Sequence, residues 1–236
     1  MSICLFCRSE INSFLSVEHI FPESLGNKEK ILPKGVVCDK CNNGVLSFLD
    51  SELVNFDVIL FLRTFYGIEA KSGNIPRASF STISLENPLK RHVNVVLKRK
   101  NKNDFIETSE GFDLNFAGRK KMSEKNTKLL ARALYKIGLE LLCLDHGLEF
   151  CLSSRFDDVR NIVLGKQDFH GYLCLGSNKS SDKVGVTYIF FNTEEKNNVA
   201  LFEFNYMFLK IVFDMEMRKS NLENGAKIIG LNILKF

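Results

Sequence analysis

The chain contains no tryptophan, only four prolines and four histidines, and no apolar run that approaches the length of a membrane span. A spanning helix needs about 20 apolar residues, and the start Met1-Ser2-Ile3-Cys4 lacks the basic and apolar regions of a signal peptide. We therefore expect a cytoplasmic protein. Apolar residues make up 45% of the 236 residues and include 21 Phe, which supplies a core and excludes a disordered chain.

The seven cysteines need an explanation other than disulfides, which a reducing compartment disfavours. Four of them form two pairs of identical spacing: Cys4-x2-Cys7 and Cys38-x2-Cys41. Two such pairs are typical of a closed tetrahedral Zn²⁺ site, which leaves no coordination position for chemistry. The sequence therefore predicts a structural zinc ion. The other three cysteines stand alone in apolar surroundings and are expected to be buried and unreactive: Cys143, Cys151 and Cys174.

Three polar residues accompany the cysteine pairs. Glu18 and His19 lie between the two pairs, and Asn42 follows the second pair directly. An imidazole is a general base near neutral pH, and carboxylate and amide oxygens are ligands for Mg²⁺ or Mn²⁺. These are the parts of a metal-dependent phosphodiester hydrolase. Plainer interpretations remain open: Glu18 as a surface ion-pair partner, Asn42 as a helix N-cap, and His19 as a packed or surface residue. On a regular strand Glu18 and His19 would also point to opposite faces.

Basic residues are concentrated outside this segment. Residues 1–50 carry five Lys/Arg and six Asp/Glu, a net charge of −1, whereas residues 90–136 carry thirteen Lys/Arg and five Asp/Glu, a net charge of +8. The second region could hold a nucleic acid through its phosphates, although a solvated charged surface explains the same pattern. The candidate nucleic-acid-binding residues are Lys98, Arg99, Lys100, Arg119, Lys120 and Lys121. Arg132, Lys136 and Arg160 could also contact phosphates, but core packing explains their pattern better.

The pattern of the whole chain predicts an α+β fold. We expect a short β segment over 31–37, helices over 42–53, 56–65, 123–144 and 156–164, and strands within 78–85, 92–97, 184–192 and 199–213. The last two strands are expected to form a hairpin. We place a small module at residues 1–55 and a mixed α+β domain at residues 56–236. The second domain could bind DNA, a partner protein or an activating ligand. Its strands near Tyr188 and Phe204 could line a pocket, although an ordinary core explains them more simply.

Three segments joined together resemble a known family. They are Cys4-x2-Cys7, Glu18-His19-Ile20-Phe21-Pro22 and Cys38-Asp39-Lys40-Cys41-Asn42-Asn43. They are similar to the HNH endonucleases, in particular the group with an Asp/Glu-His-Ile-x-Pro core flanked by two zinc knuckles. The resemblance covers residues 4 to about 53.

The resemblance implies a ββα-metal fold, in which two strands and a helix surround one divalent ion. It assigns His19 as the general base, Glu18 as the acidic metal ligand and Asn42 as the last HNH position, which also contacts the metal. It further implies structural Zn²⁺, catalytic Mg²⁺ or Mn²⁺, a DNA substrate with RNA not excluded, and a bacterial or phage protein for which defence is one expected role.

The sequence departs from the family pattern at two positions. The acid is more often Asp, and the middle Asn falls near Pro33, where Asn27 or Asn43 could replace it. A single HNH site cuts one strand, so a homodimer is expected for double-strand cleavage. The alternative to a nuclease is a zinc-stapled nucleic-acid-binding or adaptor protein that has lost hydrolysis.

Overall fold

The computed structural model describes residues 2–26, 29–80, 83–90, 92–98, 105–114, 124–177, 185–192, 199–207, 209–215 and 232–235. Contacts divide the chain into two compact units. Unit 1 comprises Met1–Val54 and Glu124–Phe236, and unit 2 comprises Asn55–Ser123. The predicted boundary between an N-terminal module and a second domain, at residues 55 and 56, stays a prediction. The contacts group the residues that follow unit 2 in the sequence with the N-terminal segment.

The N-terminal part of unit 1 follows the order strand, strand, helix. Its elements are β1 (Glu18–His19), η1 (Glu23–Leu25), β2 (Ile31–Leu32), α1 (Asp39–Cys41), η2 (Asn42–Leu46) and α2 (Ser47–Val54). β1 and β2 are antiparallel, with Glu18 opposite Leu32 and His19 opposite Ile31. Pro33 follows β2 directly, where its missing N–H ends the ladder. The helix expected from residue 42 begins as a π-helical turn with a kink at Gly44.

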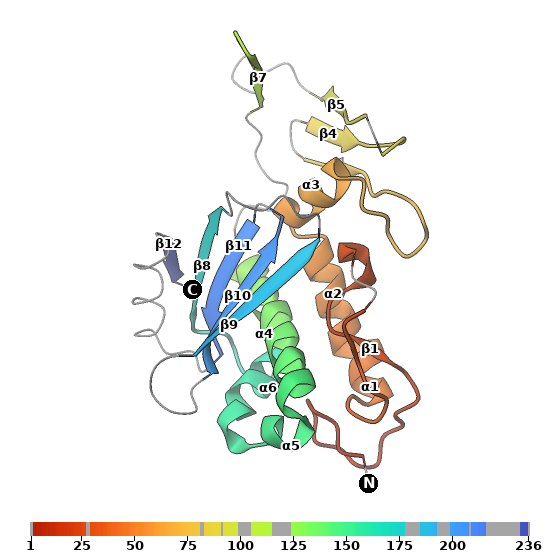
Figure 1. The fold of residues 1–236 in the computed structure, drawn as a ribbon, viewed down its shortest axis with the longest axis vertical. Helices are drawn as coiled ribbons and strands as arrows, with labels where there is room; N and C mark the ends of the chain where they lie inside the picture. The colour runs from red at the N-terminus through yellow and green to blue at the C-terminus, as the bar shows by residue number, and fades with distance from the viewer. Residues whose placement is uncertain are drawn as a thin grey trace. The chain divides into compact units, whose positions relative to one another are not determined.

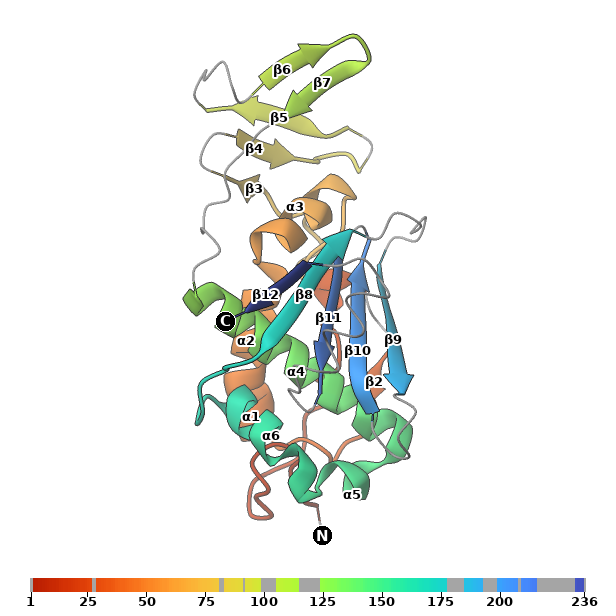
Figure 2. The same ribbon diagram turned by 90° about the vertical axis from the view of Figure 1, so that its left-hand side faces the viewer.

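The C-terminal part of unit 1 is a sheet with helices. Its elements are α4 (Glu124–His146), α5 (Leu148–Cys151), η3 (Ser154–Phe156), α6 (Asp157–Leu164), β8 (Tyr172–Ser177), β9 (Val186–Asn192), β10 (Val199–Tyr206), β11 (Leu209–Asp214) and β12 (Asn232–Lys235). The strands pair antiparallel in the order β12-β8-β11-β10-β9. α4 runs across one face of this sheet, and α2 lies beside α4 (Figures 1 and 2). α4 therefore lies against both the sheet and α2.

α4 is the best predicted element of the chain. The apolar period placed a helix over 123–144, and the structure confirms it as Glu124–His146. The helix ends where Gly147 adopts a φ of +86° and its N–H binds the carbonyl of Cys143. The Tyr135 hydroxyl donates to the Asp214 carbonyl at 2.8 Å. Gly138 allows a close approach, because a Cβ there would lie 2.5 Å from the Met215 Sδ.

One expected strand is two strands in the structure. The pattern of alternation predicted a single strand over 199–213, but the chain reverses between β10 and β11, with Tyr206 opposite Leu209. Met207 adopts a φ of +54° at this turn, a conformation usually left to glycine or asparagine. Neither glycine nor proline occurs between Tyr206 and Leu209, so the residue types did not indicate a turn.

Unit 2 combines one helix with two small sheets. Its elements are α3 (Asp57–Phe65), β3 (Ala78–Ser79), β4 (Ile83–Glu86), β5 (Asn94–Leu97), β6 (Phe105–Thr108) and β7 (Gly111–Leu114). The sheets have the orders β3-β4-β5 and β6-β7. α3 packs on the first sheet through a buried cluster of Leu60, Ala78, Phe80, Ile83 and Leu85. The α+β class is thus confirmed in both units, and within the described ranges no helix is long and apolar enough to cross a membrane.

Candidate functional site

The four paired cysteines come together in unit 1. Their sulfur atoms all lie within 4.8 Å of one another. Cys7 Sγ and Cys38 Sγ are 3.6 Å apart, close to the sulfur separation of about 3.8 Å that a tetrahedral site with 2.3 Å Zn–S bonds requires. A disulfide would bring two sulfurs to about 2.05 Å. The arrangement therefore fits one structural zinc ion.

Hydrogen-bond donors surround these sulfurs. Asn12 Nδ2 lies 3.4 Å from Cys38 Sγ and 3.7 Å from Cys7 Sγ, and the Cys38 N–H points at Cys4 Sγ at 3.4 Å. The hydrogen bond between Cys4 and Cys41 lowers the pKa of the Cys4 thiol to about 4 and raises the pKa of Cys41. Donors of this kind stabilise thiolates, which are the form that binds zinc.

Asp39 ties the second cysteine pair to the segment that leads into β1. Its carboxylate accepts hydrogen bonds from the Leu15 N–H at 3.0 Å, from the Ser16 N–H at 2.7 Å and from the Ser16 hydroxyl. Hydrogen bonds from Ser13 and Ser16 lower the pKa of Asp39. The zinc knuckle thus also determines where the chain enters β1, a role that the sequence did not announce.

His19 lies on the accessible side of β1. Its side chain is 30% exposed, and its Nε2 is 3.2 Å from Glu23 Oε1, on the short helix η1. Pro22 precedes η1, and its carbonyl accepts a hydrogen bond from Leu25. Beyond His19 the strand continues with a hydrogen bond from the Ile20 N–H to the Lys30 carbonyl. The imidazole is therefore partly exposed to solvent, and the backbone that follows it is held by the hydrogen bonds of Ile20 and Leu25.

Glu18 points the other way, as the alternation of a strand requires. It is 4% exposed, and its Oε1 lies 2.6 Å from the Nζ of Lys136, on α4. The same Nζ lies 2.9 Å from Asp50 Oδ1, 3.2 Å from the His19 carbonyl and 3.4 Å from Glu140 Oε2. We call these five residues the Lys136 cluster. Glu18 is thus an ion-pair partner, as one interpretation held, but its expected place at the surface is wrong because Glu18 itself is buried.

Charge in the Lys136 cluster is unbalanced. Burial raises the pKa of Glu18 and Asp50, against the opposing effect of Lys136, and the pKa of Glu140 lies well above its usual value for the same reason. Burial alone would lower the pKa of Lys136, but the carboxylates outweigh it and the net shift is upward. Burial therefore disfavours the charged form of the three carboxyls, whereas their charge favours the charged form of the Lys136 ammonium.

Asn42 holds the start of β1. Its Nδ2 donates to the Val17 carbonyl at 3.1 Å and to the Ser16 hydroxyl at 3.2 Å. It lies inside η2, after the N-cap residue Cys41, so the interpretation of Asn42 as a helix N-cap is wrong. The amide nitrogen is used within the protein, which leaves the amide oxygen as the atom suited to a metal.

The three predicted site residues are neighbours, but their side chains diverge. Among the described residues, Glu18 binds Lys136, His19 binds Glu23, and Asn42 binds the residues before Glu18, with no direct contact between the three. Burial raises the pKa of Glu18, and His19 lies close enough to oppose part of that upward shift. Their roles as base and metal ligands stay predictions.

The predicted nucleic-acid contacts are only partly visible. Lys98 binds the Phe80 carbonyl at 2.9 Å and the Ser79 hydroxyl, so its ammonium is engaged within unit 2. The other five candidates lie outside the described residues: Arg99, Lys100, Arg119, Lys120 and Lys121. Asn27 also lies outside them.

The three basic residues of α4 and α6 have protein partners. Arg132 donates to the Val163 carbonyl at 2.9 Å, and Arg160, 3% exposed, donates to the Ser153 carbonyl at 2.7 Å. Lys136 is fully buried. Packing was the favoured interpretation of these residues, and their contacts agree with it.

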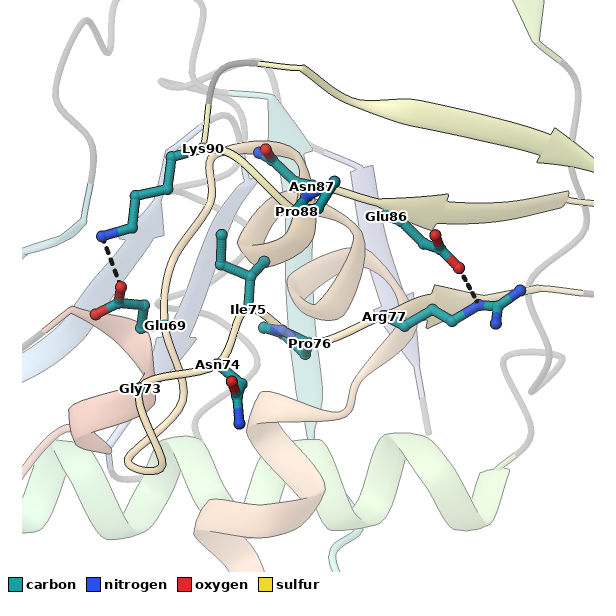
Figure 3. A pocket seen from close by; sticks show the side chains of 10 residues that line it. All are labelled: Glu69, Gly73, Asn74, Ile75, Pro76, Arg77, Glu86, Asn87, Pro88 and Lys90. Carbon is teal, nitrogen blue, oxygen red and sulfur yellow. Dashed lines mark ion pairs between the residues drawn. The ribbon is translucent and has the colours of Figure 1, made fainter.

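A pocket of about 370 Å³ lies in unit 2, between the segments 69–77 and 86–90 (Figure 3). Its charges are paired, with Lys90 Nζ 2.6 Å from Glu69 Oε1 and Arg77 Nε 3.0 Å from Glu86 Oε1.

Tyr188 and Phe204 in unit 1 pack on Phe21. Their ring centroids lie 5.9 and 6.3 Å from that of Phe21. Those strands therefore contribute an aromatic core, which was the simpler of the two interpretations.

Comparison with known proteins identifies one family. Residues 4–56 match a family model described as HNH endonuclease. No curated protein and no solved structure matches the chain. The matched segment holds the cysteine cluster, both strands of the β1–β2 pair and the helix α2. The resemblance seen in the sequence is therefore confirmed for residues 4–56, the part of the chain that matches the HNH endonuclease model.

Proposed function

We propose that this protein is a cytoplasmic, metal-dependent endonuclease that hydrolyses phosphodiester bonds in DNA. The observation that carries the proposal is the HNH match over residues 4–56, in which clustered cysteines support a strand that presents His19 to solvent. His19 is the general base in this proposal. Nε2 lies 3.2 Å from Glu23 Oε1, and in this proposal the proton of the imidazole is on Nε2, so that Nδ1 is the basic nitrogen that takes a proton from water.

Glu18 and Asn42 are the proposed ligands of a catalytic Mg²⁺ or Mn²⁺. A carboxylate offers two oxygens, so Glu18 can bind Lys136 through Oε1 and a second cation through Oε2, while Asn42 offers its amide oxygen. When bound, such an ion stabilises negative charge on the phosphate and the leaving oxygen. Hard cations of this kind commonly use only one or two protein ligands beside a phosphate.

The first test is nicking of supercoiled plasmid by the full chain with Mg²⁺ or Mn²⁺. We expect His19→Ala to slow nicking by about 10² to 10⁴-fold, the usual contribution of a general base. His19 is partly exposed and away from the sulfurs, so zinc content and melting temperature should match those of the native protein. Equal cutting by the two proteins would remove His19 from the mechanism.

The second candidate function is zinc-stabilised nucleic-acid binding without hydrolysis. The observation that favours it is the divergence of the three side chains, with Glu18 committed to a buried ammonium. It predicts salt-dependent binding of DNA with no product under any divalent ion. Binding and cleavage assays on matched DNA and RNA strands separate these outcomes.

The finer parts of the proposal concern assembly and biological setting. One HNH site cuts one strand, so we propose that a homodimer makes double-strand breaks and that an activating ligand or partner protein can switch the site on. A rate of linear-product formation that rises with the square of enzyme concentration would support the dimer. For a role in bacterial or phage defence, fewer plaques on cells carrying the native gene than on cells carrying His19→Ala is the expected result.

A further inference from the structure

Helix α4 sends one ammonium group into the HNH segment, although it lies outside residues 4–56. The Nζ of Lys136 has no exposed surface and lies among four oxygen atoms. An ammonium has three N–H donors. The three shortest contacts go to the Glu18 carboxylate at 2.6 Å, the Asp50 carboxylate at 2.9 Å and the His19 carbonyl at 3.2 Å.

These three acceptors belong to two different elements of the HNH segment. Glu18 and His19 form β1, and Asp50 lies on α2. Lys136 therefore links β1 to α2 on the side of β1 that the Glu18 side chain faces. Asn42 holds the residue before Glu18 through the Val17 carbonyl, so residues 17–19 are fixed by a donor from η2 and by a donor from α4.

The contact with the His19 carbonyl separates this arrangement from an ordinary ion pair. It fixes the backbone of the residue whose side chain faces Glu23 and solvent. Glu140 contacts the same Nζ at 3.4 Å, but neither of its oxygens has a hydrogen-bond partner among the described residues. Glu140 thus shares the charge without holding β1, and it provides a natural control.

We propose that Lys136 is a positioning residue of the nuclease site. Its ammonium fixes β1 so that His19 faces solvent and Glu18 keeps one orientation on the opposite side of the strand. This proposal rests on the proposed function, in which His19 is the base and Glu18 a metal ligand. It also makes the catalytic segment dependent on a helix that the family match does not include.

The test compares Lys136→Met with Glu140→Gln in the full, zinc-loaded chain. Methionine has nearly the length of lysine but no charge and no donor. We expect Lys136→Met to lower the kcat of plasmid nicking by about 100-fold, the effect of a displacement of about 1 Å in a catalytic group. The KM for DNA should change by less than about threefold, since binding is not the affected step. Glu140→Gln should keep kcat within about twofold of the native value.

Hydrogen exchange of the Ile20 amide gives a readout that needs no catalysis. This amide binds the Lys30 carbonyl and reports on the β1–β2 pairing, whereas the Leu5 amide, bound to the Val36 carbonyl, reports on the zinc knuckle. In Lys136→Met we expect faster exchange at Ile20 and unchanged exchange at Leu5. Native exchange at Ile20 in that variant would overturn the proposal, even if the native protein proves not to cut DNA.

A second variant covers the case in which Lys136→Met does not fold. Asp50→Asn weakens the link between Lys136 and α2 without leaving the buried ammonium unpaired, because Glu18 remains. We expect a lower kcat and faster Ile20 exchange, with one zinc per chain retained. Native Ile20 exchange in folded Lys136→Met, or in Asp50→Asn where Lys136→Met does not fold, overturns the positioning role, and so does a native kcat in the same variant. A native protein that never cuts DNA overturns the proposed function alone.

Discussion

At the scale of single residues, Asn12 shows how much of the zinc site lies outside the four ligands. Its amide donates toward two sulfurs, those of Cys7 and Cys38. Such outer partners commonly contribute 10 to 100-fold to metal affinity. We expect Asn12→Ala to weaken zinc binding by about tenfold, measured by competition with a chromogenic chelator.

The neighbouring residue provides the control. Ile11 is 96% exposed, so Ile11→Ala should leave zinc affinity unchanged. If both variants bind zinc as the native protein does, the amide of Asn12 does not stabilise the thiolates.

The cysteine cluster was predictable from the sequence, whereas the partner of Glu18 was not. The spacing of the cysteines predicted the cluster that the structure forms, and the role of the Glu18-His19 pair in catalysis stays a prediction. The ion pair between Glu18 and Lys136 was invisible, because all of unit 2 separates the two residues in the sequence. The only local sign was a lysine and a glutamate four residues apart, Lys136 and Glu140, inside an apolar stretch of helix.

At the scale of elements, the contact between α4 and β11 depends on a buried phenol. Tyr135 donates to the Asp214 carbonyl and packs edge-on against Phe213, with ring centroids 5.0 Å apart. Tyr135→Phe keeps the ring and removes one buried hydrogen bond. We expect it to lower the free energy of unfolding by about 1 kcal/mol, measured by urea denaturation.

Tyr188→Phe is the matched control for that measurement. Its ring packs against Phe21 and Phe190, but its hydroxyl has no hydrogen-bond partner within the described part of the chain. A change within about 0.5 kcal/mol is expected. A loss of equal size in both variants would assign the effect to the ring environment and not to the hydrogen bond.

Long elements were predictable and short ones were not. α4 announces itself through many turns of apolar period. β1 and β2 contain two residues each, too few for any alternation, so no sequence pattern could indicate their bounds or their pairing. The turn between β10 and β11 escaped because Met207 takes a left-handed conformation without a glycine.

At the scale of the whole molecule, the HNH segment depends on the rest of unit 1. Ile20 and Phe21 are buried, and Phe21 packs on Tyr188 and Phe204 from the large sheet. The isolated segment 1–56 should therefore bind zinc through its cysteines but show no cooperative unfolding transition in calorimetry. The zinc-loaded full chain is the reference. A sharp transition for the fragment would show that its own core is sufficient.

Unit 1 is assembled from residues on both sides of unit 2 in the sequence. During synthesis the two cysteine pairs therefore leave the ribosome first, and helix α4 follows only after unit 2. A message cut short within unit 2 yields a product that can hold zinc but exposes Ile20 and Phe21 and has no cation beside Glu18. Incomplete translation thus leaves these apolar side chains uncovered, and the site of the proposed function is complete only once synthesis has passed Lys136.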